Sequence, residues 1–261
     1  MSVVETTTYS VIGHFDRLND PVMNTYWAGP CEIPFNFMIE SITEYISDLS
    51  LNKLIPAMLK STGITIEVFV LVLLFSVPLA LLICFGRMSR IKVISEVTKF
   101  FLLVIRGTPL MLQLIFVYFA PQMIFQIGFD RFTAGIVAMV INYAAYFAEI
   151  YRGGIQSIPQ GQYEAGKVLG FTRNQTFMRI VMPQVVKKII PPMGNEVITL
   201  VKDTALIQVL GVAELFHVAK TQSGALVSVM PLFIAGVFYF IMNWAVSKAF
   251  DYTEKKLDYY K

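Results

Sequence analysis

Five long apolar runs constrain the fold of this sequence more than any other feature. They occupy about residues 64–86, 99–122, 131–151, 190–212 and 227–249, and the fourth run carries several polar residues. A helix rises about 1.5 Å per residue, so about 20 residues cross the hydrocarbon core of a bilayer. The runs are continuous rather than alternating, which favours helices over the strands of a barrel. The sequence therefore predicts an all-α integral membrane protein with five transmembrane helices.

The composition excludes several other classes of protein. Hydrophobic residues make up 56% of the chain and charged residues 15%, whereas charged residues are about 25% of a typical soluble domain. An ordinary soluble enzyme is therefore excluded, and a net charge of +3 is too small to indicate a nucleic-acid partner. Cys31 and Cys84 cannot form a disulfide framework, and two His residues are too few for an ordinary His-based metal site. We expect no metal site, and membrane lipid as the surroundings.

The distribution of Lys and Arg predicts the orientation of the chain. Most of them lie between the first and second runs, between the third and fourth, and after the fifth. Basic loops stay in the cytosol, so the amino end is predicted outside and the carboxyl end inside. Residues 1–62 form an extracytoplasmic leader in which 39–59 read as an amphipathic surface helix or, alternatively, a solvated linker. Residues 63–250 form the transmembrane domain, including a cytosolic loop at 152–189, and 251–261 form a cytosolic tail.

Polar residues inside the second, third and fourth runs are candidates for a substrate path. At about 100° per residue, the five polar residues of the fourth run share about one third of the helix circumference. Such a face avoids lipid and borders a cavity or another helix, and ionisable groups in membranes default to functional hypotheses. The candidates are Arg106, Gln113, Asn142, Tyr146, Glu149, Asn195, Glu196, Thr199, Lys202 and Asp203.

Two interpretations of these charges stay open. A zwitterionic amino acid needs a cation for its carboxylate and acids or carbonyls for its ammonium group, and this set offers both. Alternatively, the charges form buried ion pairs that only fix helix packing, with Arg106 or Lys202 opposite Glu149, Glu196 or Asp203.

The cytosolic stretch 160–184 contains an incomplete phosphate-binding motif. Gly161, Gly166 and Lys167 fit the start of the G-x-x-x-x-G-K pattern. The next residue is Val168, whereas a Ser or Thr hydroxyl must hold Mg²⁺ there, and no buried strand precedes the motif. We therefore expect no ATPase site, no bound cofactor and no catalytic residue in this chain, which is not itself an enzyme.

The same stretch matches a longer pattern. Glu164-Ala165-Gly166, then Gly170, then Ile180, Met182 and Pro183 fit E-A-A-x3-G-x9-I-x-L-P with two conservative departures, at Gly166 and Met182. This resembles the cytoplasmic loop of the permease subunits of ABC importers. The segments at 106–113, 145–152, 202–204 and 211–215 resemble the polar-amino-acid branch of that family, the histidine, glutamine and arginine type. The resemblance runs from about residue 63 to the carboxyl end and omits 1–52.

The resemblance implies the fold of a type I ABC importer permease and a role in ATP-driven import of a polar or charged L-amino acid across the plasma (bacterial inner) membrane. It also implies a second, identical or related permease, two ATPase subunits that hold ATP and Mg²⁺, and an extracytoplasmic binding protein. The coupling residues would be Glu164, Ala165, Gly166, Gly170, Phe171 and Pro183. Small residues at 165 and 166 would let a helix approach the ATPase closely, and Gly170 suits a helix end with positive φ.

Two other functions remain as alternatives. A stand-alone secondary transporter or channel could use Lys202 and Asp203 as an ion relay, although the absence of an internal duplication argues against it. A membrane enzyme is disfavoured because no nucleophile–base pair stands out. For the loop, the alternative to a coupling contact is a solvated amphipathic connector.

Overall fold

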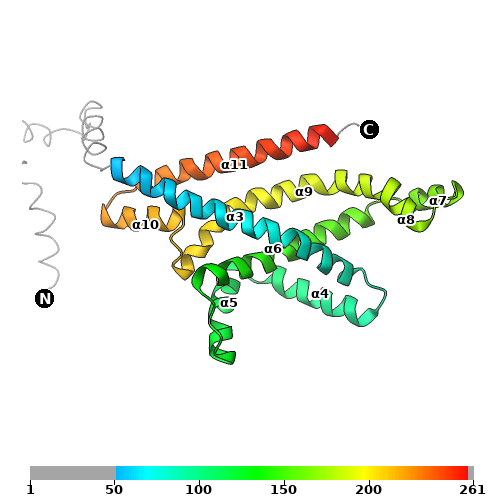
Figure 1. The fold of residues 1–261 in the computed structure, drawn as a ribbon, viewed down its shortest axis with the longest axis horizontal. Coiled ribbons are helices and arrows are strands. Elements are labelled where there is room, and N and C mark those ends of the chain that lie inside the picture. The colour runs from blue at the N-terminus through cyan, green and yellow to red at the C-terminus, as the bar shows by residue number, and fades with distance from the viewer. Residues whose placement is uncertain (1–50, 258–261) are drawn as a thin grey trace, which may run out of the picture. The chain divides into compact units, whose positions relative to one another are not determined.

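In a computed structural model of the chain, the structure describes residues 51–257, and every regular element within that range is helical. Figure 1 shows their arrangement. The elements are α3 (Leu51–Arg87), α4 (Lys92–Gly107), α5 (Leu110–Phe125), α6 (Arg131–Gln156), α7 (Gln160–Val168), α8 (Arg173–Thr176), the π-helix η3 (Phe177–Val181), α9 (Met182–Asp203), the 3₁₀-helix η4 (Thr204–Leu210), α10 (Leu215–Ala225) and α11 (Met230–Leu257).

The first predicted span belongs to a longer helix. Helix α3 is continuous from Leu51 to Arg87, so no break separates the end of the predicted leader from the span. Polar side chains inside it bond to the helix itself: the Ser61 hydroxyl donates to the carbonyl of Met58 at 3.0 Å and Thr65 to that of Ser61 at 3.2 Å. The rest of the predicted surface helix, 39–50, lies outside the described residues.

The second predicted span is a pair of helices. Helices α4 and α5 meet at a bend of 110°. Between them Thr108 is extended, with φ −116° and ψ 145°, and Pro109 precedes the first residue of α5. Proline has no N–H to donate and disfavours helical geometry in the residue before it, which explains the break.

Three described helices are long and apolar enough to cross a membrane alone, namely α3, α6 and α11, and a fourth crossing results if the bent α4–α5 pair is one span. Helix α9 is not among these helices, because its polar residues lower its mean hydropathy. An all-helical membrane protein is therefore found, whereas length and hydropathy support three or four crossings rather than five.

Helix α6 lies at the centre of the packing. Most of its residues are buried, and many of them are Ala or Gly. A Cβ at Gly135 would clash with the side chain of Ile207 in η4, and one at Gly154 would clash with Ile189 in α9. Small residues therefore let these elements approach α6 closely, as is common between membrane helices.

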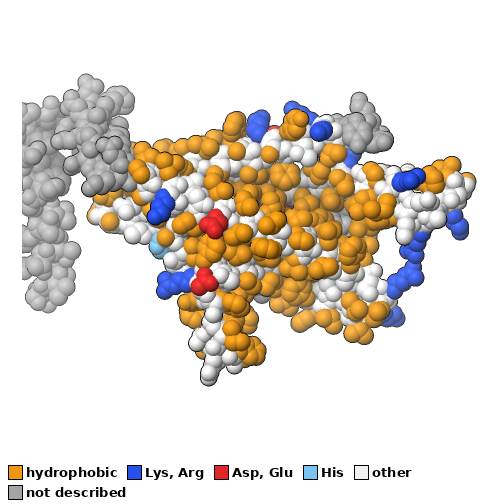
Figure 2. All heavy atoms as spheres, viewed as in Figure 1, with side chains coloured by type: hydrophobic (Ala, Val, Ile, Leu, Met, Phe, Trp, Pro, Cys, Tyr) orange, Lys and Arg blue, Asp and Glu red, His pale blue; other side chains and the backbone are white. Residues whose placement is uncertain are grey.

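The connections divide between two ends of this helical unit. The α3–α4 turn, α7 with α8, and the carboxyl end of α11 lie toward one end, and α10 with the start of α3 lies toward the other (Figure 1). Figure 2 shows hydrophobic side chains over much of the middle, and several Lys and Arg side chains toward the end that carries α7 and α8.

Candidate functional site

A charged cluster joins α4 to α6. Glu149 accepts hydrogen bonds from Arg152, with 2.6 Å between Arg152 Nη2 and Glu149 Oε2, and Arg106 Nη1 lies 3.7 Å from the same oxygen. The Arg106 guanidinium also lies 5.3 Å from the ring centroid of Tyr146. Of the predicted pairings, the structure therefore forms the one between Arg106 and Glu149, and Arg152 is an additional partner that the sequence reasoning missed.

A cavity of about 380 Å³ borders this cluster. Three cations and one acid face it, together with apolar residues of α4. Its lining is Arg87, Lys99, Leu102, Leu103, Arg106, Gly107 and Glu149. The excess of cations suits a carboxylate, because charge-assisted hydrogen bonds from a guanidinium are the strongest that a side chain offers it.

Gln113 holds the α4–α5 break together. Its Nε2 donates to the carbonyl of Ile105 at 2.7 Å and to the carbonyl of Thr108 at 3.1 Å. These carbonyls have no helical partner once Pro109 interrupts the helix. The Asn142 Nδ2 donates to Gln113 Oε1 at 2.9 Å, so α6 is tied to the break. Two predicted path residues, Gln113 and Asn142, are thus hydrogen-bonded to each other.

The end of α9 is tied to α6 in a similar way. The Tyr143 hydroxyl donates to Asp203 Oδ2 at 2.8 Å, and Tyr143 is buried. Tyr143 therefore contacts Asp203, one of the predicted path residues, although Tyr143 itself was not among the predicted candidates. Glu196 is half-buried and lies within electrostatic range of Arg106, Tyr143 and Asp203.

Three predicted residues on α9 remain exposed. Asn195, Thr199 and Lys202 lie at helical spacing on one face and are exposed in the isolated chain. Among the described residues, no ion pair engages Lys202, and the Thr199 hydroxyl donates only to the carbonyl of Asn195, at 3.0 Å. This polar stripe adjoins the buried polar contacts of α9 and faces away from the core.

The candidate coupling residues lie on and after α7. The helix presents Glu164 and Ala165 to the exterior, together with Val168, which is 87% exposed. Gly170 has φ +76°, as predicted for a helix end with positive φ. Phe171 is half-buried, and its N–H donates to the carbonyl of Gly166 at 2.9 Å, while Pro183 is exposed at the start of α9.

Gly166 corrects one detail of the sequence analysis. It is buried, and a Cβ there would lie 2.5 Å from Cγ2 of Thr176 in α8. Its small size therefore serves the packing of α7 on α8 within this chain, whereas Ala165 is exposed and available to a partner. The segment from Gly161 to Lys167 is helical and follows helix α6, which is not the strand–loop setting of a phosphate-binding loop.

Sequence reasoning missed a buried acid toward the other end. Glu214 is fully buried and caps α10, accepting from the N–H groups of Phe216 at 2.7 Å and His217 at 2.6 Å. The Tyr239 hydroxyl donates to it at 2.9 Å. Burial raises the pKa of the Glu214 carboxyl, and these hydrogen bonds oppose the rise. An acid directly before an apolar helical run was the available signal.

Among residues 51–257, no group of three or more His, Cys, Asp or Glu side chains is arranged to hold a metal ion.

Comparison with known proteins places these features in a family. The family described as binding-protein-dependent transport system inner membrane component matches residues 76–259. The L-cystine transport system permease protein TcyB of Bacillus subtilis is 37% identical over 199 residues, covering 75% of this chain and 84% of that protein. The glutamine transport system permease protein GlnP of Escherichia coli is 35% identical over 205 residues, covering 78% and 94%.

Two solved structures of ABC transporters also resemble this chain. A chain in a crystal structure of an amino acid ABC transporter with histidines has a TM-score of 0.74 and 35% identity, covering 80% of this chain and 97% of that one. A chain of the inward-facing MetNI methionine ABC transporter has a TM-score of 0.60 at 18% identity, covering 78% and 95%, which is a likeness of fold.

Proposed function

This chain belongs to the family of binding-protein-dependent transport system inner membrane components, and from this premise we propose that it is the permease subunit of an ATP-driven importer of a polar or charged L-amino acid. The arginine transport permease ArtQ of Bacillus subtilis, 35% identical over 206 residues, widens the range of relatives from cystine and glutamine to a charged substrate. As a permease component the chain supplies the path, and ATP with Mg²⁺ belongs to a separate ATPase subunit.

The observation that carries the proposal is the exposed polar stripe on α9. Asn195, Thr199 and Lys202 project from a helix whose other face packs on α6 and α11. Polar groups facing lipid are costly, so this stripe must border water or another polar surface. A path between two permease copies, identical or related, meets that need.

The substrate's charges have counterparts beside this stripe. Arg106, at the cavity lined by three cations, suits the carboxylate of an amino acid. Glu196 and Asp203 are acids on the same helix as the stripe and suit its ammonium group. The pairing of Arg106 with Glu149 at 3.7 Å is long for an ion pair, so a substrate carboxylate can compete for the guanidinium. Tyr146, whose ring contacts Arg106, supports this arrangement, as do Gln113 and Asn142, which hold the α4–α5 break.

The proposed topology has five spans. Helices α3, α6 and α11 are three of them, the bent pair α4–α5 is one broken span, and α9 is the fifth. Helix α9 crosses despite its polar residues because its polar face borders the path rather than lipid. The basic α3–α4 turn, the segment 152–189 and the tail then lie in the cytosol, the amino end lies outside, and the membrane is the bacterial inner membrane.

Coupling is assigned to the exposed face of α7 and the turn after it. Glu164 can pair with a base on the ATPase, and exposed Ala165, Val168 and Leu169 offer a small and apolar surface for a groove. Gly170 supplies the left-handed turn that ends α7, with Phe171 and Pro183 supporting the segment. The complete importer would hold two ATPase subunits and an extracytoplasmic binding protein. These findings favour this reading over a stand-alone secondary transporter or channel.

The test is reconstitution of the permease in vesicles with its ATPase and binding protein, and uptake across a panel of amino acids. Wild-type permease should take up a polar or charged amino acid only with ATP and the ATPase. Uptake without the ATPase would favour the secondary transporter.

The coupling assignment has its own variants. Glu164→Lys with Gly170→Val should abolish uptake and substrate-stimulated ATP hydrolysis while the permease still inserts in the membrane. Glu254→Lys, a charge reversal at an exposed position near the carboxyl end of α11, is the matched control and should retain uptake. Wild-type uptake by the Glu164/Gly170 variant would reject the coupling role.

A further inference from the structure

The Arg106 guanidinium keeps its donors free although an acid lies beside it. Its Nη1 lies 3.7 Å from Glu149 Oε2, beyond hydrogen-bond distance, and within residues 51–257 it donates no hydrogen bond. The guanidinium carbon lies 5.3 Å from the centroid of the Tyr146 ring, a cation–π contact that steadies the side chain. The five N–H donors of Arg106 therefore stay available to a ligand.

Both oxygens of Glu149 are held by Arg152 instead. Arg152 Nε donates to Glu149 Oε1 at 3.1 Å and Nη2 donates to Oε2 at 2.6 Å, the bidentate arrangement in which arginine binds a carboxylate most strongly. Arg152 Nη1 also donates to Gln156 Oε1 at 2.6 Å. The three residues follow at i, i+3 and i+7 on one face of α6, so Arg152 is fixed from both sides.

The other two bases that line the 380 Å³ cavity already have partners. Arg87 Nη1 donates to the Ser95 hydroxyl at 3.0 Å, and Lys99 Nζ lies 3.5 Å from Glu96 Oε2. Among the described residues that line this cavity, Arg106 is therefore the base that donates no hydrogen bond to the protein. A carboxylate in the cavity has Arg106 as its best available donor.

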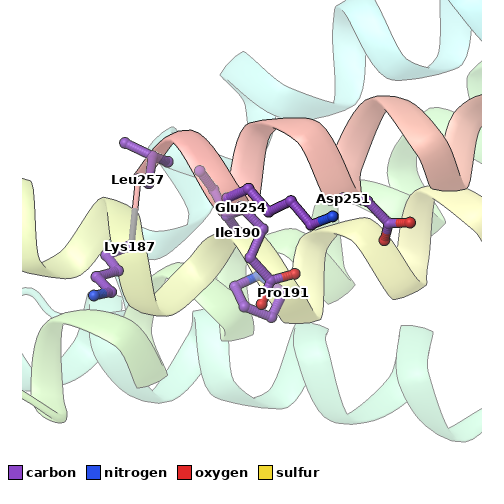
Figure 3. Close-up of a pocket in the computed structure, with 7 residues that line it drawn as sticks. Lys187, Ile190, Pro191, Asp251, Glu254 and Leu257 are labelled. Carbon is purple, nitrogen blue, oxygen red and sulfur yellow. The ribbon is translucent and has the colours of Figure 1, made fainter. Parts of the chain in front are cut away.

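The cavity between α9 and α11 gives a contrast (Figure 3). It measures about 350 Å³, and two acids and two bases line it, namely Asp251, Glu254, Lys187 and Lys255. Its lining is thus balanced in charge, whereas three bases and one acid line the cavity at Arg106. An anionic group is therefore favoured at Arg106 rather than between α9 and α11.

We propose that Arg152 is a positioning residue, which holds Glu149 so that Arg106 stays available for the carboxylate of the transported amino acid. Without Arg152, Glu149 would keep a partly buried charge whose nearest cation is Arg106. The two groups would then need to approach by only about 1 Å to form a charge-assisted hydrogen bond. That pair would occupy the donors that a substrate needs. The inference rests on the proposed import of an amino acid and adds a residue to its substrate site.

The competing role for Arg152 is purely structural. An ion pair that only steadied the end of α6 would also be lost with Arg152, but the two roles differ in what Glu149 does next. Removing Glu149 as well cannot repair a structural loss, whereas under the proposal it frees Arg106. Glu149→Gln in the Arg152→Gln background is therefore the variant that separates them.

The first measurement needs no substrate. Phenylglyoxal reacts more slowly with a guanidinium that is held in an ion pair, and peptide mass spectrometry of the purified full-length permease gives the rate at Arg106 alone. We expect Arg152→Gln to slow this rate about fivefold, the occupancy that a half-exposed ion pair reaches. Arg152→Gln with Glu149→Gln should restore the wild-type rate. Arg90→Gln, an exposed base in the α3–α4 turn, is the matched control and should leave it unchanged.

The second measurement is amino-acid binding to the same purified proteins. The probes are L-arginine and L-glutamine, each with the amine that lacks the α-carboxyl group, agmatine and 4-aminobutanamide. Arg152→Gln should weaken binding of the amino acid about fivefold, because only Arg106 side chains free of Glu149 are competent, and should leave binding of the amine unchanged. Arg152→Lys keeps a cation opposite Glu149 and should retain most of the affinity.

Two outcomes would overturn the proposal: an unchanged rate of Arg106 modification in Arg152→Gln, or no recovery when Glu149→Gln is added. Equal weakening of the amino acid and its amine would assign Arg152 the structural role. If the wild type binds neither amino acid while the modification rates change as expected, the proposed substrate class is rejected and the hold of Arg152 on Glu149 is supported, so the two failures are distinguishable.

Discussion

At the scale of single residues, Gly166 and Glu214 each fix one local contact. Gly166 packs against Thr176, and Glu214 caps α10 from a fully buried position. Both belong to stretches that the sequence analysis identified, yet neither role follows from the residue type. A glycine in a helix does not reveal which neighbour lies against it, and an acid before a helix does not reveal its burial.

Gly166→Ala should destabilise the α7–α8 packing by about 1–3 kcal/mol, the usual cost of overpacking. The added Cβ would lie 2.5 Å from Thr176 Cγ2, and thermal unfolding of the purified protein measures the effect. Gly161→Ala is the matched control in the same helix, since nothing lies within 4 Å of its Cβ. An equal effect of the two substitutions would contradict the packing role.

Glu214 predicts a pH dependence of stability. Its pKa is higher in the folded protein than the ordinary 4.5, so the folded state binds more protons between these two values. The free energy of unfolding should therefore fall as pH rises from 4.5 toward the raised pKa, and stay level above it. Unfolding measured across the acidic and neutral range reports this slope.

Two variants separate the cause of that slope. Glu214→Gln should remove it, because the group no longer titrates. Tyr239→Phe removes a donor that stabilises the carboxylate and should extend the slope to higher pH. A Glu214→Gln variant with an unchanged slope would show that another group is responsible.

At the scale of elements, the break between α4 and α5 distinguishes this protein from a bundle of straight helices. Pro109 explains why the helix ends, but the 110° bend persists because Gln113 binds the freed carbonyls and Asn142 binds Gln113. The sequence analysis placed Gln113 and Asn142 on polar faces of different spans. Their direct contact depends on the packing of α5 against α6.

A double-mutant cycle tests the hydrogen bond between Gln113 and Asn142. Gln113→Ala and Asn142→Ala should each destabilise the protein, and together by less than the sum, with a coupling energy of about 0.6–1 kcal/mol for a hydrogen bond between membrane helices. Unfolding in detergent gives the four free energies. Strict additivity would mean that the two side chains act separately.

At the scale of the whole molecule, the proposed topology puts the α3–α4 turn and α10 on opposite sides of the membrane. Ser89→Cys should react with an impermeant thiol reagent only from the cytosol, and Gly224→Cys, just before the carboxyl end of α10, only from outside. Both belong in a background with Cys31→Ser and Cys84→Ala, the two native cysteines. Labelling of both from the same side would reject the odd number of spans.

The sequence by itself determined the membrane class, the helical fold, the family and the position of the 160–184 segment, because continuous apolar runs and a long spaced motif depend only on residues near each other in the chain. Tertiary structure decided which polar residues meet. The pairing of Arg106 with Glu149 and the Tyr143–Asp203 hydrogen bond join residues from different elements. Helical periodicity gives the direction of each face, but the distance between two faces depends on how closely small residues such as Gly135 and Gly154 let the helices approach.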